Sequence, residues 1–180
     1  MSSEDRAHHG SERATLDIFN TLAAEGPNAA IEESRQCFAP LIGSWSLESI
    51  WYEQNEPTRQ GNGEWHFAWV LGGRGVQDVI FMRGASPDEY GTTIRCYDAG
   101  LDTWFVTFMQ PAGREFVSLV ARRLDDQIVQ EGRALDESSL ERWTFSETTS
   151  ESFRWRGESS RDGARTWRLD QQMTASRLQS

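Results

Sequence analysis

One carboxylate and one guanidinium in this sequence are placed where they could bind a ligand or take part in catalysis. Asp78 lies in the segment GVQDVIFM, where it alternates along a predicted strand with Val76 and Ile80 and so shares their apolar face. An inward carboxylate is costly to bury unless it is paired. Arg95, in the next predicted strand, is the natural partner. Two interpretations stay open: an ion pair that braces the interior, or a polar handle for a bound molecule.

The same residues support a catalytic hypothesis. A dry, aromatic pocket favours the neutral form of a carboxyl group, which suits proton transfer near neutral pH. Asp78 would be the base, and Arg95 or Tyr97, on one face with Thr93, would stabilise developing charge. The reaction would be a cofactor-free isomerisation, cyclisation or hydration of a hydrophobic metabolite.

Further polar residues are assigned to faces by alternation. His66 alternates with Trp65 and Phe67, so it faces outward if these aromatic residues face inward. The alternative places His66 at the mouth of a barrel, as a general base or a ligand contact. In the segment QIVQEG, either Gln130 or Glu131 must face inward, where it would contact a ligand.

Arginines and tryptophans of the later strands are assigned in the same way. Arg154 and Arg156 alternate with aromatic residues and are expected on the outer face, with Glu141 and Asp170 as candidate partners. With the opposite assignment they form an anion clamp inside the barrel. Tryptophans with apolar neighbours occur in four different strands and are expected to line the core or a cavity: Trp69, Trp104, Trp143 and Trp155.

Composition excludes several classes of protein. The 180 residues suffice for one domain with a sizeable core, and the 8 Trp, 9 Phe and 3 Tyr supply large rings for it. The formal net charge of −10 argues against nucleic acids and anionic membranes as partners. All 18 basic residues are arginines, which excludes Schiff-base lysine chemistry and a phosphate-binding loop lysine.

No metal or cofactor site is expected. The two cysteines, Cys37 and Cys96, are far apart and lack zinc-ligand spacing. A disulfide between them stays open, but two thiols in a reducing cytoplasm are favoured, so the protein is expected to be cytoplasmic. No apolar run is long enough to span a membrane as a helix.

The elements that position these residues change character along the chain. Residues 1–10 are expected to be a disordered tail, and helical spacing predicts helices over 11–24 and, before Pro40, over a short stretch within 28–39. A barrel is expected over 41–177, with a long polar connection at 53–63. Period-two patterning and turn residues predict about ten strands, near 42–52, 64–71, 76–83, 92–98, 103–110, 116–123, 127–133, 139–147, 152–159 and 165–175.

Short turns between these strands predict an antiparallel meander. A meander of this length exposes its edges unless it closes, so we expect a mainly β protein with a single closed up-and-down β-barrel and one or two N-terminal helices. Such a barrel can hold one small hydrophobic or amphipathic metabolite, and binding is favoured over catalysis. A homodimer that uses an apolar face of the barrel is a further interpretation.

A known pattern occurs at the start of the first strand. Gly43-Ser44-Trp45 resembles the Gly-x-Trp of the calycins, the superfamily of lipocalins and fatty-acid-binding proteins. Later segments, including GTTIRCYD, DTWFVTFMQP and ERWTFSETTSESFRWRG, look like a family of bacterial calycin-like domains of unknown function. The resemblance covers residues 40–177 and implies the barrel, with Arg177 or Arg168 packed on the Trp. The haem-binding branch of this superfamily has an axial histidine late in the barrel. Because no histidine follows His66 here, the resemblance implies that haem is not bound.

Overall fold

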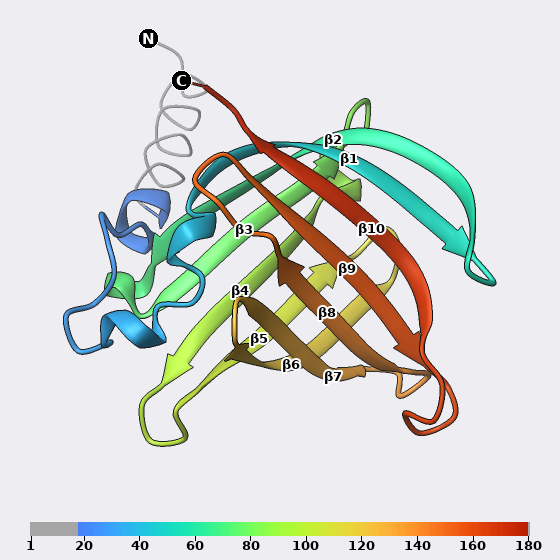
Figure 1. The fold of residues 1–180 in the computed structure, drawn as a ribbon. Coiled ribbons are helices and arrows are strands. Elements are labelled where there is room, and N and C mark those ends of the chain that lie inside the picture. Colours follow the sequence, from blue (N-terminus) through green and yellow to red (C-terminus); the bar gives the residue numbers. More distant parts are fainter. Residues whose placement is uncertain (1–17, 180) are drawn as a thin grey trace, which may run out of the picture.

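Ten antiparallel strands close into one barrel in the computed structural model, which describes residues 18–179 (Figure 1). Each strand pairs with its neighbours in sequence, and the last strand pairs with the first, so no edge is left open. The predicted barrel is confirmed. The strands are β1 (Gly43–Glu53), β2 (Glu56–Val70), β3 (Gly75–Met82), β4 (Gly91–Asp98), β5 (Thr103–Gln110), β6 (Glu115–Leu124), β7 (Gln127–Ala134), β8 (Leu140–Ser146), β9 (Ser152–Ser160) and β10 (Arg168–Arg177).

The first hairpin is longer than the sequence predicted. Residues 53–63 were expected to be a polar connection, but β2 already begins at Glu56 and pairs with β1 from Glu53 onward. The turn consists of Gln54 and Asn55, whose φ angles of 53° and 67° suit a two-residue hairpin. Most side chains on both faces of this extension are exposed, so the alternation that marks a half-buried strand is absent.

Within the described residues, the N-terminal segment is α-helical over residues 18–22. The earlier part of the predicted first helix, and the predicted tail at 1–10, lie outside the described residues. The predicted second helix is wrong: its stretch forms two 3-10 turns, η1 (Glu33–Arg35) and η2 (Ala39–Leu41). Asn28 does not cap a helix there; its Oδ1 accepts the Ala30 N–H at 3.0 Å and closes a local turn instead. Ile31 and Phe38 are buried.

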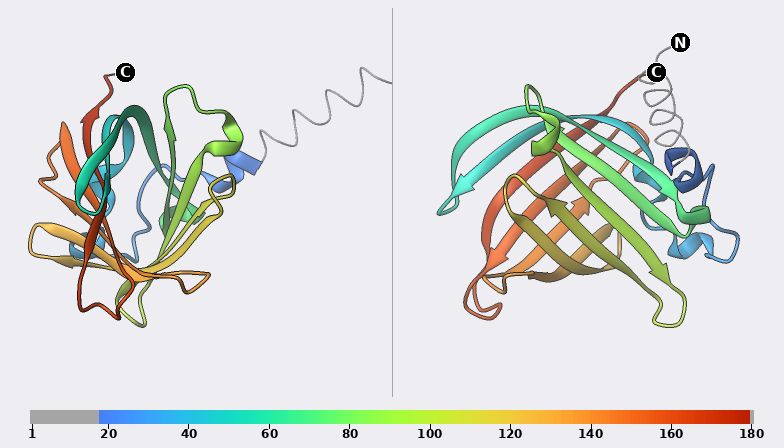
Figure 2. Two further views of the ribbon diagram at one scale, coloured as in Figure 1. Left: turned by 90° about the vertical axis from the view of Figure 1, so that its right-hand side faces the viewer. Right: turned by 180° about the vertical axis from the view of Figure 1, so that it is seen from behind.

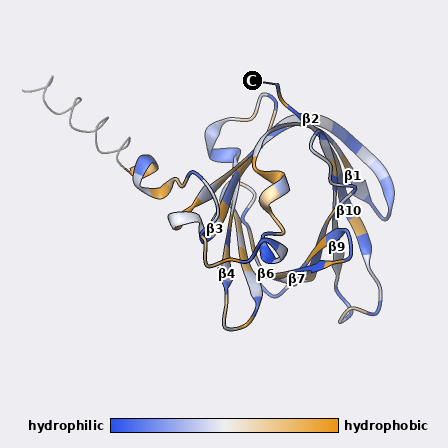
Figure 3. Cartoon of the chain, turned by 60° about the vertical axis from the view of Figure 1, so that its left-hand side comes forward, coloured by the Kyte–Doolittle hydropathy of each residue, from blue (hydrophilic) through white to orange (hydrophobic). Residues whose placement is uncertain are grey.

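This segment seals one end of the barrel, which we call the closed end. Figure 3 looks toward it and shows the N-terminal turns across the ring of strands. The Ala24 N–H donates to the Trp69 carbonyl at 2.9 Å, and the Asn28 N–H donates to the Gly73 carbonyl at 3.0 Å. Gly73 is required here, because its φ is 77° and a Cβ would lie 2.2 Å from the Gly26 carbonyl oxygen. The fully buried Phe38 fills the space beneath.

Arg177 covers the first tryptophan of the barrel. Its guanidinium lies 3.9 Å from the ring centre of Trp45 and donates to the carbonyls of Ile42 at 3.0 Å and Pro40 at 3.2 Å. Of the two predicted arginines, Arg177 is therefore the one that packs on the tryptophan, and it links β10 to the chain just before β1.

Both cysteines are free thiols. Cys37 is buried in the closed end, and burial raises its pKa to about 12. Cys96, near the end of β4, is half-buried, and burial raises the pKa of its thiol as well. Neither thiol is therefore activated as a nucleophile.

Candidate functional site

A cavity of about 460 Å³ occupies the other end of the barrel, which we call the open end. Figure 2 shows this end in its left view, with the strands arranged around the axis. Much of the wall of the cavity is aromatic, and its rings come from five of the ten strands. These wall residues are Trp51, Trp65, Phe108, Trp143 and Trp155.

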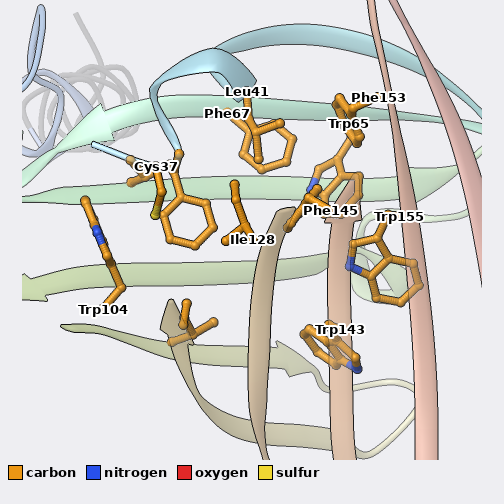
Figure 4. Close-up of a cluster of buried hydrophobic side chains, with 14 of the residues drawn as sticks. Cys37, Leu41, Trp65, Phe67, Trp104, Ile128, Trp143, Phe145, Phe153 and Trp155 are labelled. Atoms are coloured by element: carbon orange, nitrogen blue, oxygen red, sulfur yellow. The ribbon is translucent and has the colours of Figure 1, made fainter. Parts of the chain in front are cut away.

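The aromatic wall is packed ring against ring. The centre of the Trp143 ring lies 5.4 Å from Phe108 and 5.7 Å from Trp155, and Trp155 in turn lies 6.3 Å from Trp65, all in edge-on geometries. Figure 4 shows Trp65, Trp143 and Trp155 projecting from different strands toward the interior. Each indole is thus held by its neighbours, and the cavity wall is preformed.

A buried ion pair lies at the floor of the cavity. Arg95 Nη1 donates to Asp78 Oδ2, and the Thr93 N–H donates to Asp78 Oδ1 at 3.2 Å. The side chains of Arg95 and Asp78 are only 1% and 0% exposed. The pairing predicted from the sequence is confirmed. Arg95 lines the cavity, whereas Asp78 lies behind it and has both oxygens engaged.

Aromatic rings surround the guanidinium of Arg95. Its central carbon lies 5.0 Å from the ring centre of Phe38, 5.5 Å from Phe67 and 5.9 Å from Phe145. A cation that has lost its hydration shell is stabilised by such rings, in addition to its carboxylate partner. The ion pair at the floor therefore lies between the N-terminal segment, which seals the closed end, and the cavity at the open end.

Several buried polar atoms have no hydrogen-bond partner within residues 18–179. They are Arg95 Nε, Trp65 Nε1 and both amide atoms of Gln130. Of Gln130 and Glu131 in β7, Gln130 is the residue that faces inward, and it is fully buried. Buried polar groups are normally satisfied, so unsatisfied ones favour any ligand or water that can reach them. Trp65 and Arg95 line the cavity, whereas Gln130, a predicted ligand contact, does not.

Carboxylates gather near the mouth of the cavity. Glu115 lines it, and partial burial together with the nearby Asp170 raises the pKa of Glu115. Burial also raises the pKa of Glu141, with Asp170 and Glu115 adding to the effect. A β-bulge between Leu169 and Gln171 in β10 accommodates Asp170 there. The mouth therefore carries concentrated negative charge.

Three of the predicted site residues face inward but lie at the closed end. Trp104 donates its indole N–H to the Arg35 carbonyl at 2.9 Å, and the Trp69 carbonyl binds the N-terminal segment. Tyr97 packs on Trp104 with 5.5 Å between ring centres, and its hydroxyl donates to Asp102 at 2.8 Å. None of these three lines the cavity. The predicted catalytic set of Asp78, Arg95 and Tyr97 is therefore not assembled around one space.

Other predicted ligand contacts lie on the outer wall. His66 is 38% exposed and contacts Ser44 Oγ at 2.9 Å and Glu64 at 3.1 Å, so its outward assignment is confirmed and a place in the cavity is wrong. Glu131 also points outward, where it pairs with Arg142 at 2.8 Å. Alternation along β2 and β7 turns these side chains away from the lumen.

The two arginines of β9 are outward as well. Arg154 pairs with Glu147 at 3.1 Å, and Arg156 pairs with Glu158 at 3.0 Å. The alternative of an internal anion clamp is wrong, and the partners differ from the candidates named from the sequence. All four are exposed or partly exposed side chains, so these pairs contribute little to the free energy of unfolding.

Sequence reasoning missed the residues that form the mouth. Arg59 lies 3.9 Å over the ring of Trp51, and both line the cavity, but Arg59 falls in the stretch expected to be a loop. Glu115 is the second residue after a Pro-Ala-Gly turn. Its alternation with the inward Val117 is the signal that could have identified it.

Within residues 18–179, no three His, Cys, Asp or Glu side chains are arranged to hold a metal ion. In the same range, no helix is both long and apolar enough to cross a membrane.

Comparison with known proteins supports the fold. No family model matches the chain, and no curated protein matches it. Among solved structures, Rv2717c from M. tuberculosis superposes with a TM-score of 0.55 at 14% identity, over 83% of this chain and 99% of that one. This likeness shows a shared fold. A protein of unknown function from Nostoc punctiforme, of the DUF3598 family, aligns over 82% of this chain and 100% of that one, but its TM-score of 0.24 at 8% identity carries no argument.

Proposed function

We propose that this protein binds a small, largely apolar molecule inside the open end of the barrel. The observation that carries the proposal is the preformed aromatic cavity of about 460 Å³. Ligand sites in proteins are typically concave, mostly apolar and provided with a few polar groups that fix orientation. The buried donors of Trp65 and Arg95 would be those groups.

The alternative, an acid/base enzyme acting on a hydrophobic metabolite, is less well supported. Its base, Asp78, is buried behind Arg95 with both oxygens engaged, and Tyr97 faces the closed end. A general base must lie within hydrogen-bonding reach of the proton that it removes. The calycin membership, the cytoplasmic location and the homodimer expected from the sequence remain predictions.

Fluorescence titration tests the binding function. The uncharged dye N-phenyl-1-naphthylamine should bind with a stoichiometry of one, with a blue shift and enhancement of its emission and quenching of tryptophan. Trp143→Phe, in the cavity wall, should weaken the binding of the dye. Trp167→Phe is the matched control, because Trp167 stacks on the outward Arg142 and does not line the cavity.

The result that would contradict the proposal is equally direct. If the dye and a series of similar apolar probes fail to bind the folded protein, or bind with affinities that Trp143→Phe and Trp167→Phe change equally, the cavity is not the site. Native mass spectrometry of the purified protein adds an independent readout, since a bound metabolite would appear as a discrete added mass.

A further inference from the structure

Two residues that line the cavity carry buried N–H groups with no acceptor among residues 18–179. These groups are Trp65 Nε1 and Arg95 Nε. Both are hydrogen-bond donors, and neither side chain can accept a hydrogen bond. A buried donor without an acceptor is unfavourable, so a ligand atom that supplies an acceptor is preferred at this place.

The two donors border the same small region. The ring centre of Trp65 lies 4.9 Å from Phe67 and 5.5 Å from Phe145. The guanidinium carbon of Arg95 lies 5.5 Å and 5.9 Å from those same two rings. Figure 4 shows Trp65, Phe67 and Phe145 in neighbouring positions. Both nitrogens are covered by neighbouring atoms at the floor of the cavity, so the polar end of one ligand reaches both donors once these rings shift.

The floor has donors but no net charge. Asp78 already neutralises Arg95, and both side chains are shielded from water. A carboxylate brought to this floor would place a second negative charge beside one guanidinium in a medium of low dielectric constant. A carbonyl oxygen accepts the same hydrogen bonds and brings no charge.

The mouth disfavours anions as well. Glu115 lines it, and Glu141 and Asp170 lie close enough to interact electrostatically with Glu115. Glu89 also lines the cavity. Two guanidiniums lie near these carboxylates: Arg59, which lies over a tryptophan ring, and Arg168, which pairs with Asp170 at 2.6 Å. Since the whole chain has a net charge of −10, an anionic ligand is repelled on its way in.

We infer that the cavity takes an uncharged, largely apolar ligand with a carbonyl group, such as a ketone, ester or amide, which enters carbonyl end first. Trp65 and Arg95 donate to the carbonyl oxygen, and the aromatic wall contacts the apolar body. This inference rests on the proposed binding function and names the chemical class of the ligand.

Three probes of nearly one shape test the ligand class. 2-Acetylnaphthalene carries the carbonyl, 2-isopropenylnaphthalene replaces its C=O by C=CH₂, and 2-naphthoate is the anion. Each displaces bound N-phenyl-1-naphthylamine at pH 7. The ketone should bind at least about tenfold more tightly than the alkene and than the carboxylate, because only it satisfies the donors without adding charge.

A tryptophan variant assigns the effect to the floor. Trp65→Phe removes one donor and keeps an aromatic ring, so the advantage of the ketone over the alkene should fall severalfold while the affinity of the alkene changes little. Trp155→Phe is the matched control: Trp155 lines the same cavity, and its indole nitrogen is not among the buried unpaired atoms. This control should leave the ratio of the two affinities unchanged.

An infrared measurement keeps the inference testable if Trp65→Phe does not fold. The carbonyl stretching band of 2-acetylnaphthalene bound to the unaltered protein should lie at lower wavenumber than in hexane, as hydrogen bonding requires.

Equal affinities for the ketone and the alkene, tightest binding of the carboxylate, or a band at the hexane position would each overturn the inference while leaving the binding function intact. Failure of the dye itself to bind would instead remove the binding function and the inference with it.

Discussion

Removing either member of the buried ion pair should destabilise the protein far more than removing both. Asp78→Asn keeps the shape of the side chain and an oxygen for the Thr93 N–H but leaves Arg95 without a counter-ion. Arg95→Met keeps much of the apolar stem and leaves the carboxylate of Asp78 without its cation. The double variant contains no charge at all in this part of the barrel.

The magnitude follows from the burial of the pair. Because the two side chains are 1% and 0% exposed, water does not screen them. Two unit charges about 4 Å apart attract by about 4 kcal/mol at an effective dielectric constant of about 20. Each single variant should therefore lower the free energy of unfolding by about 3–5 kcal/mol. The double variant should lose about 1–3 kcal/mol, which is the cost of one unsatisfied buried amide.

Urea denaturation followed by tryptophan fluorescence measures these differences. The four proteins form a double-mutant cycle, and the expected coupling energy is about 3 kcal/mol or more, because both single changes remove the same interaction. If the single variants are unfolded and the double variant is folded, the same conclusion holds. A double variant that loses the sum of the two single losses would refute the reasoning, since the charges would then act independently.

Three further predictions follow from other contacts. Phe38→Ala should lower the free energy of unfolding by about 3–5 kcal/mol, because a fully buried ring is lost from the closed end, whereas the exposed Leu101→Ala should change it little in the same urea titration. Gly132→Ala should prevent folding or lower the melting temperature strongly, because its Cβ would lie 2.0 Å from a backbone oxygen of β6. Gly26→Ala, with no atom within 4 Å of its Cβ, is the control. Equal melting temperatures of the two variants would contradict the register of β6 and β7. Burial and two neighbouring carboxylates raise the pKa of Glu141 in the folded state, so ionisation of Glu141 destabilises the fold as pH rises. Glu141→Gln should therefore be more stable than the parent protein at pH 7 and equal to it at pH 3. The opposite order at pH 7 would show that the fold stabilises the carboxylate.

The face of each side chain could be predicted from the sequence because strand geometry is local. Alternation alone placed Asp78 inward and His66 and Arg154 outward, and all three assignments agree with the structure. The closed barrel was also predictable. A meander joined by short turns leaves unpaired backbone groups on its two edge strands unless the sheet closes.

The position of a residue along the barrel axis could not be predicted in the same way. Trp104 and Trp143 both face inward, yet one packs under the N-terminal plug and the other lines the cavity. Alternation says nothing about height, which depends on the stagger between strands and on which end the N-terminal segment covers. For the same reason Tyr97, two residues from Arg95, was assigned to a site that it does not reach.

Among residues 18–179, the N-terminal segment covers one end of the barrel and so makes it a cup. A molecule bound in the cavity would leave by the open end through which it entered, so the segments at the rim would control both its arrival and its departure. A molecule longer than the cup would keep its far end outside, in contact with water or with another macromolecule. The portion first inserted would then decide recognition, and the length of the remainder would be free to vary.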